Sequence, residues 1–165
     1  MRYISAFLLG AVSGTRSMLA PTVASWATQA QRLNVDESAV SFLQRPGTAM
    51  LLATLASGEL VGDKLPFMPD RKKPLPFLGR VAMGAIAGAA VGAGAKELPQ
   101  CALLGAAGAF LGTLAGSALR RGLSESLGRD FPAALLEDLA AACVVALALQ
   151  QLDKAAPSTV LQAAA

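Results

Sequence analysis

The chain has 165 residues, of which 54% are hydrophobic and 15% are charged, and its mean hydropathy is +0.51. This composition excludes an ordinary soluble domain and is typical of a protein embedded in a membrane. The formal net charge of +3 does not require a nucleic-acid partner, because basic loop residues of a membrane protein face anionic lipid head groups. The chain contains no histidine, which excludes a histidine proton relay and a Ser-His-Asp triad.

The length and the lack of any linker rich in Ser, Gly or Pro predict a single integral membrane domain over 1–152. A short flexible tail is expected over 153–165. Within the domain, a window of about 20 residues finds five apolar segments that are long enough to cross a bilayer. We therefore predict an all-α, polytopic transmembrane helical bundle of about five spans. The spans are 3–27, 47–65, 77–95, 100–119 and 131–152.

The first apolar segment has two interpretations. Arg2 precedes an apolar run, as in a secretory signal, but the apolar sequence continues to Trp26, which favours a retained membrane helix. Pro21 removes the amide that would bond the carbonyl of Ser17, so this helix should bend or loosen between Thr15 and Pro21. Backbone groups freed at membrane depth must be buried in protein or line a cavity. By itself the proline fits a simple kink, whereas its combination with the buried charges below favours a cavity.

The segment 29–45 joins the first two spans. It mixes charged and apolar residues, a composition compatible with a short surface helix. Pro46-Gly47 then opens the second span and Pro66 closes it, because proline is tolerated in a first helical turn and does not continue a helix.

Charged residues occur inside the first, second and fifth predicted spans. Glu59 and Asp63 lie four residues apart and therefore on one face of the second helix. Glu137 and Asp138 lie in the fifth span and Arg16 in the first. A charge at membrane depth costs roughly 2.5 to 3.5 kcal/mol on insertion scales, so it normally faces a protein interior or a water-filled path. Similar depths predict one polar cluster, a candidate ion or substrate site. Its members are Arg16, Glu59, Asp63, Lys64, Glu137 and Asp138.

This predicted cluster carries more negative than positive charge. Arg16 is the only deeply placed base, against four carboxylates. We expect some carboxyl groups to be protonated, or cations, water or Lys64 to compensate them. No metal or cofactor is expected, because Cys101 and Cys143 are too far apart along the predicted spans for a joint site.

The third and fourth spans carry glycines at intervals of four residues. A link of about four residues, 96–99, makes these helices antiparallel neighbours. We predict a glycine-zipper hairpin, because small residues let two helix backbones approach closely. Its members are Gly84, Gly88 and Gly92 in the third span and Gly108, Gly112 and Gly116 in the fourth.

The positive-inside rule predicts the orientation in a bacterial inner membrane. Nine basic residues fall on one predicted side and four on the other, so the first side is expected to be cytoplasmic. The N-terminus is then cytoplasmic and the C-terminus periplasmic. The nine are Arg2, Lys64, Arg71, Lys72, Lys73, Arg80, Arg120, Arg121 and Arg129.

The chain also resembles a known family in three blocks. These are Gly14-Thr15-Arg16-Ser17 with Pro21; Gly58-Glu59 with Asp63-Lys64-Leu65-Pro66 and Pro69; and Glu137-Asp138. They are similar to small bacterial membrane proteins known only as the domain of unknown function numbered 4126. The resemblance implies an integral inner-membrane protein with a shared polar centre, and no activity comes with it.

Three classes of function fit these observations. The leading hypothesis is a small carrier or channel-like protein whose cluster binds a cation or proton. The alternative is a structural or assembly protein in which the cluster only locks the helices together. The third, a lipid head-group enzyme, lacks a paired Asp motif for metal-dependent phosphotransfer, so no enzyme is expected. The expected partners are the bilayer and a small ion or solute, and the sequence leaves a homo-oligomer open.

Overall fold

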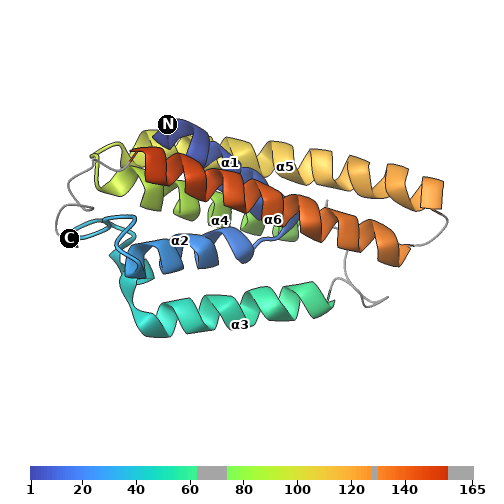
Figure 1. Ribbon diagram of the computed structural model, residues 1–165, viewed down its shortest axis with the longest axis horizontal. Coiled ribbons are helices and arrows are strands. Elements are labelled where there is room, and N and C mark those ends of the chain that lie inside the picture. Colours follow the sequence, from blue (N-terminus) through green and yellow to red (C-terminus); the bar gives the residue numbers. More distant parts are fainter. Residues whose placement is uncertain (63–73, 128–129, 156–165) are drawn as a thin grey trace.

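The computed structural model describes residues 1–62, 74–127 and 130–155, and these residues form an all-α structure. No β-strand occurs among them. The helices lie side by side along the long axis of the molecule (Figure 1). They are α1 (Arg2–Thr15), α2 (Leu19–Gln29), the 3₁₀-helix η1 (Ser41–Gln44), α3 (Pro46–Gly62), α4 (Pro74–Ala93), α5 (Leu98–Leu127) and α6 (Asp130–Ala155).

The predicted first span is two helices that form a hairpin. The chain leaves α1 at Arg16, whose backbone is extended (φ −136°, ψ 99°), and α2 runs back toward the end where α1 began (Figure 1). Two contacts confirm the reversal. Tyr3 donates a hydrogen bond of 2.9 Å to Glu97 in the α4–α5 link, and Arg32, after α2, pairs with Asp153 near the end of α6. Segment 3–27 is therefore not one continuous span.

Pro21 explains part of the difference between the predicted bend and the observed reversal of the chain. The break falls inside the interval where the sequence predicts a bend, but the chain reverses there instead of bending. Pro21 becomes the third residue of α2, where amide groups have no partner within the helix. Its missing N–H therefore costs no helical hydrogen bond at that position.

The helix directions place Arg2 and Ala155 at the same end of the bundle (Figure 1). α3 and α5 run away from this end, and α4 and α6 return to it. The sequence instead predicts the two ends of the domain on opposite sides of a membrane, and the helix directions differ from that prediction because the chain reverses between α1 and α2. α6 also extends to Ala155, so the first residues of the predicted tail are helical, and 156–165 lie outside the described residues.

Three of the described helices are long and apolar enough to cross a membrane, namely Pro74–Ala93, Leu98–Leu123 and Leu135–Lys154. α3 has 17 residues, about 25 Å at 1.5 Å per residue, up to Gly62, where the described residues end, and a full span takes about 20 residues. The predicted count of five spans is thus not reproduced, while the class of a helical membrane protein fits.

α5 lies between α1 and α4, and small residues line both of its contacts. Gly84, Gly88 and Gly92 of α4 lie against Cys101, Gly105 and Ala109 of α5. The second glycine row of the sequence, however, lies against α1 and not against α4: Gly108 meets Phe7, Gly112 meets Ala11 and Gly116 meets Thr15. The predicted pairing of the two rows with each other is therefore wrong.

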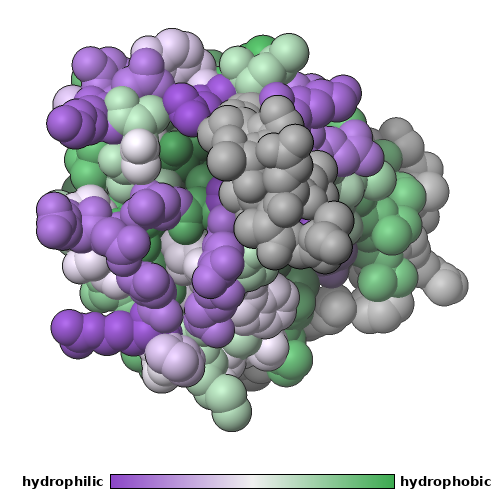
Figure 2. All heavy atoms as spheres, turned by 60° about the vertical axis from the view of Figure 1, so that its left-hand side comes forward, coloured by the Kyte–Doolittle hydropathy of each residue, from purple (hydrophilic) through white to green (hydrophobic). Residues whose placement is uncertain are grey.

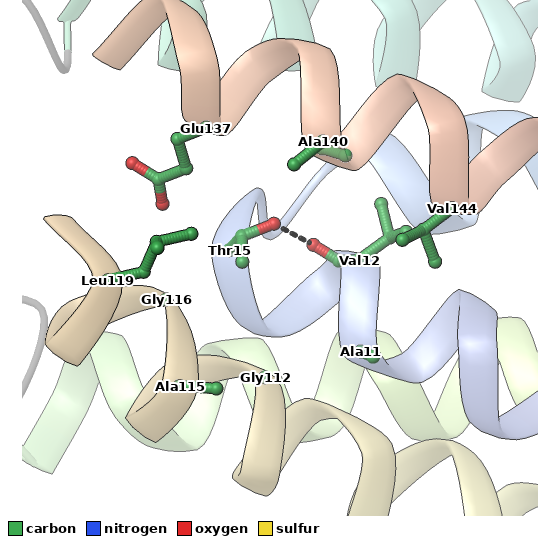
Figure 3. Close-up of a pocket in the computed structure, with 11 residues that line it drawn as sticks. Ala11, Val12, Thr15, Gly112, Ala115, Gly116, Leu119, Glu137, Ala140 and Val144 are labelled. Carbon is green, nitrogen blue, oxygen red and sulfur yellow. Dashed lines mark hydrogen bonds between the residues drawn. The ribbon is translucent and has the colours of Figure 1, made fainter. Parts of the chain in front are cut away.

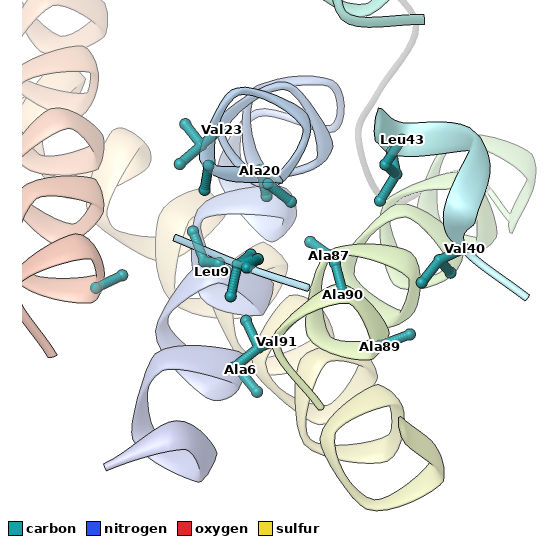
Figure 4. Packing of buried hydrophobic residues seen from close by; sticks show 14 of the residues in the cluster. Ala6, Leu9, Ala20, Val23, Val40, Leu43, Ala87, Ala89, Ala90 and Val91 are labelled. Atoms are coloured by element: carbon teal, nitrogen blue, oxygen red, sulfur yellow. The ribbon is translucent and has the colours of Figure 1, made fainter. Parts of the chain in front are cut away.

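The apolar core fills the space between the hairpin and α4 (Figure 4). Leu9 of α1, Val23 of α2, and Ala87 and Ala90 of α4 belong to this cluster. The segment after α2 contributes as well, because Leu43 of η1 is fully buried. The 29–45 segment thus covers part of the apolar core and contains a short 3₁₀-helix.

Hydrophilic residues gather at the end of the molecule where α1 begins (Figure 2). Arg32, Glu37 and Lys96 are exposed in the links at this end. Such a polar end is suited to lie outside the hydrocarbon core of a bilayer.

The glycine contacts predict a stability difference between two Gly→Ala changes. A Cβ at Gly88 would overlap the carbonyl oxygen of Cys101, whereas a Cβ at Gly58 would meet nothing within 4 Å. Gly88→Ala should therefore lower the free energy of unfolding in detergent by about 1–3 kcal/mol. Gly58→Ala should leave it unchanged or raise it by up to about 1 kcal/mol. Equal losses for the two variants would contradict this packing.

The hairpin predicts where the two ends of the chain lie. Reporter fusions before Met1 and after Lys154 should report the same side of the membrane. Fusions that report opposite sides would show that α1 and α2 cross as one helix.

Candidate functional site

The hairpin tip, Arg16 to Met18, frees backbone groups inside the bundle. The last carbonyls of α1 and the first amides of α2 have no partners within their own helices. In a bilayer no water is available to bond such groups, so side chains from neighbouring helices must do so.

Glu59 of α3 holds the amide end of the tip. Its Oε1 accepts hydrogen bonds from the Ser17 amide and the Ser17 hydroxyl, both at 2.8 Å, and its Oε2 accepts one from the Met18 amide at 3.0 Å. The carboxylate thus lies at the N-terminus of α2, where the helix dipole favours negative charge.

Arg80 of α4 holds the carbonyl end of the tip. Its Nη1 donates to the carbonyl oxygens of Gly14 at 3.0 Å and Thr15 at 2.8 Å, and Nη2 lies 3.5 Å from Oε1 of Glu59. Thr113 of α5 donates a further hydrogen bond of 3.1 Å to Gly14. The guanidinium, buried to 5% exposure, therefore neutralises the C-terminus of α1 and links it to the carboxylate at the start of α2.

Arg16, at the tip itself, reaches α6. Its side chain is 2% exposed, and its Nε donates to Oδ1 of Asp138 at 2.9 Å. Nη2 of Arg16 donates to the same oxygen. We call the four charged residues Arg16, Glu59, Arg80 and Asp138 the hairpin clamp.

The structure brings several members of the predicted cluster together. Arg16 bonds Asp138, Glu59 lies on the same tip, and Glu137, the neighbour of Asp138 in α6, pairs with Arg120 at 3.8 Å. The remaining two predicted members, Asp63 and Lys64, lie outside the described residues.

Sequence reasoning missed Arg80 and Arg120 because it counted both among the basic residues of the predicted cytoplasmic side and left them out of the cluster. In fact Arg80 lies within α4, and α5 continues beyond Arg120 to Leu127. One signal was available, since Arg80 precedes Gly84 by four residues and extends the glycine row toward the tip. With these two residues included, three guanidinium groups face three carboxylates in the described part of the cluster. The predicted negative excess does not hold there.

A cavity of about 520 Å³ adjoins the tip between α1, α5 and α6 (Figure 3). Its walls are mostly small and apolar side chains, and Glu137 is the charged residue that lines it. Glu137 is 2% exposed and points toward Gly116 and Thr15 (Figure 3). The hydroxyl of Thr15 donates to the carbonyl of Val12 at 2.9 Å. The cavity therefore pairs an apolar interior with one buried carboxylate.

Metal ligands are not grouped in this part of the chain. No set of three or more His, Cys, Asp or Glu side chains that could hold a metal ion occurs among the described residues. Cys101 is buried and Cys143 exposed, and both are free thiols.

Three of the described helices are long and apolar enough to cross a membrane, which fits a helical membrane protein. The chain belongs to the family described as domain of unknown function (DUF4126), whose model matches residues 4–152. This match confirms the resemblance seen in the sequence. Searches of curated proteins and of solved structures found no significant match.

The clamp predicts strong coupling between Arg16 and Asp138. Arg16→Met alone removes the guanidinium from a largely buried carboxylate and should cost about 3–5 kcal/mol of unfolding free energy, more than Arg16→Met combined with Asp138→Asn. A double-mutant cycle read by stability in detergent measures the coupling.

The Arg32–Asp153 pair is a matched control, because it joins the same residue types at 3.5 Å with side chains 46% and 54% exposed. Its coupling should stay below about 1 kcal/mol. Additive effects for Arg16 and Asp138 would show that these two side chains do not interact in one network.

Proposed function

We propose that this protein is a small membrane carrier in which Glu137 binds a proton or a cation in the cavity beside the hairpin tip. The observation that carries this proposal is the burial of Glu137 in an otherwise apolar cavity. Ionisable residues inside a membrane are costly and usually serve a pathway for ions or substrates. The hairpin itself supports the proposal, since broken helices whose ends meet at depth are the usual sites of substrate binding in secondary transporters.

The clamp residues are less suited to bind a transported ion. Glu59 accepts three hydrogen bonds from Ser17 and Met18, and Asp138 accepts two from Arg16. Their task in this proposal is to fix the hairpin. Glu137, by contrast, borders a volume that a ligand can enter.

Arg120 carries the positive charge that competes with a bound proton or cation for Glu137. Its Nη1 lies 3.8 Å from Oε2 of Glu137, and its side chain is 25% exposed. Protonation of Glu137, or binding of a cation, weakens this pair and lets the guanidinium turn toward the head groups. Loading and release at Glu137 are thereby coupled to the position of Arg120.

The orientation we propose differs from the one predicted by sequence. Arg120 and Arg121 lie near the end of α5, and the sequence adds five basic residues directly after α3 and α5, which makes seven, whereas the other end now includes Arg2 and contains five. By the positive-inside rule, the first end faces the cytoplasm of a bacterial cell and both ends of the chain face the periplasm.

A structural or assembly role is the second candidate. It is favoured by the balanced charges of the clamp, which bond one another and the backbone of the hairpin tip. In that case the polar groups only lock the helices together. We propose no catalytic role, because the cavity offers one carboxylate and one hydroxyl that already bonds Val12.

Flux measurements in liposomes distinguish the two candidates. Purified protein should carry protons or small cations across the vesicle membrane, and Glu137→Gln should reduce the rate at least about tenfold, because the amide neither binds nor releases a proton. Asp153→Asn is the matched control, since it removes a carboxylate from the exposed end of the same helix. An unchanged rate for Glu137→Gln would remove Glu137 from the pathway, and no flux of any probe would favour the structural role.

A further inference from the structure

The cavity is open between α5 and α6. Ala115 and Leu119 of α5 and Ala140 of α6 line it and are exposed, whereas Val12 and Ala141 form its buried floor and wall. Figure 3 shows α5 and α6 on either side of the space and α1 behind it. Both outer helices are candidate membrane spans, so the opening faces lipid chains and not bulk water.

The lining selects the chemistry of a ligand. A volume of about 520 Å³ lies within the usual range of roughly 300–1,000 Å³ for small-molecule sites. A stably bound Ca²⁺ ion takes six to eight oxygen ligands, and this lining supplies one carboxylate with Thr15 nearby. The apolar walls instead fit a hydrocarbon group, and the carboxylate fits a single positive charge.

We propose that the cavity binds an amphiphilic organic cation, an amine with a linear apolar chain, which enters from the bilayer between α5 and α6. The ammonium group lies at Glu137, and the chain follows Ala141 and Val144 into the bundle. A carboxylate-headed amphiphile of equal length is repelled by Glu137 at the same place. This inference uses the site of the proposed function, but it does not require transport.

Binding is tested with dodecylamine and dodecanoate, which share a chain length and carry opposite charge at pH 7. In a neutral detergent, saturating dodecylamine should raise the Tm of the wild type by about 5 °C or more. Dodecanoate at the same concentration should not. Glu137→Gln should lose most of the shift.

Two matched substitutions locate the site. Ala141 is buried in the cavity wall, whereas Ala142 is exposed and does not line the cavity. Ala141→Phe should fill the cavity and abolish the shift, and Ala142→Phe should keep it. Equal shifts from dodecanoate, or a full shift in Ala141→Phe, would overturn the inference.

A second measurement does not depend on the folding of Ala141→Phe. In a Cys143→Ser background, Ala140→Cys places a thiol at the rim of the cavity, and Ala142→Cys places one outside it. Dodecylamine should slow alkylation at position 140 at least about fivefold and leave position 142 unchanged. Equal rates with and without amine at position 140 would overturn the inference. Amine binding without flux would remove the carrier proposal alone, and proton flux without amine binding would remove this inference alone.

Discussion

The fold depends on one constraint, the satisfaction of backbone groups at the reversal between α1 and α2. Two carbonyls and two amides at this tip bond side chains from α3, α4 and α5, and Arg16 of the tip binds α6. In a medium without water each unbonded group would cost several kcal/mol. The relative positions of four helices are thus tied to five consecutive residues of the chain, Gly14 to Met18.

Charged side chains also stabilise the two helix ends at this reversal. The guanidinium of Arg80 lies at the negative end of α1 and the carboxylate of Glu59 at the positive end of α2, and the two side chains approach each other. Each ion is therefore stabilised by a helix end as well as by its partner. The clamp residues bond one another and the backbone of the tip, and Glu137 is the carboxylate that lines the cavity.

Small residues determine where the bundle is dense and where it is hollow. Where backbones meet directly, as at Gly88 against Cys101 and Gly112 against Ala11, glycine allows close contact. Between α5 and α6 the side chains of Ala115, Ala140 and Ala141 are too short to fill the space, and a cavity remains. The same property of the sequence therefore yields tight packing on one side of α5 and a ligand-sized space on another.

The sequence by itself determined the membrane class, the all-α fold, the helix start at Pro46 and the family, because composition, periodicity and proline placement act locally. It also placed Arg16 and Asp138 at similar depths. Only the tertiary structure decided that the chain reverses at Arg16, because an apolar segment has the same periodicity whether it crosses or turns back. The partners that stabilise the reversal, Glu59 and Arg80, are 42 and 65 residues away from the groups they bond at Ser17 and Thr15. The sequence also did not determine which row of small residues on α5 packs against α1 and which against α4. Both rows repeat small residues every four positions, and they differ only in the helix that they contact.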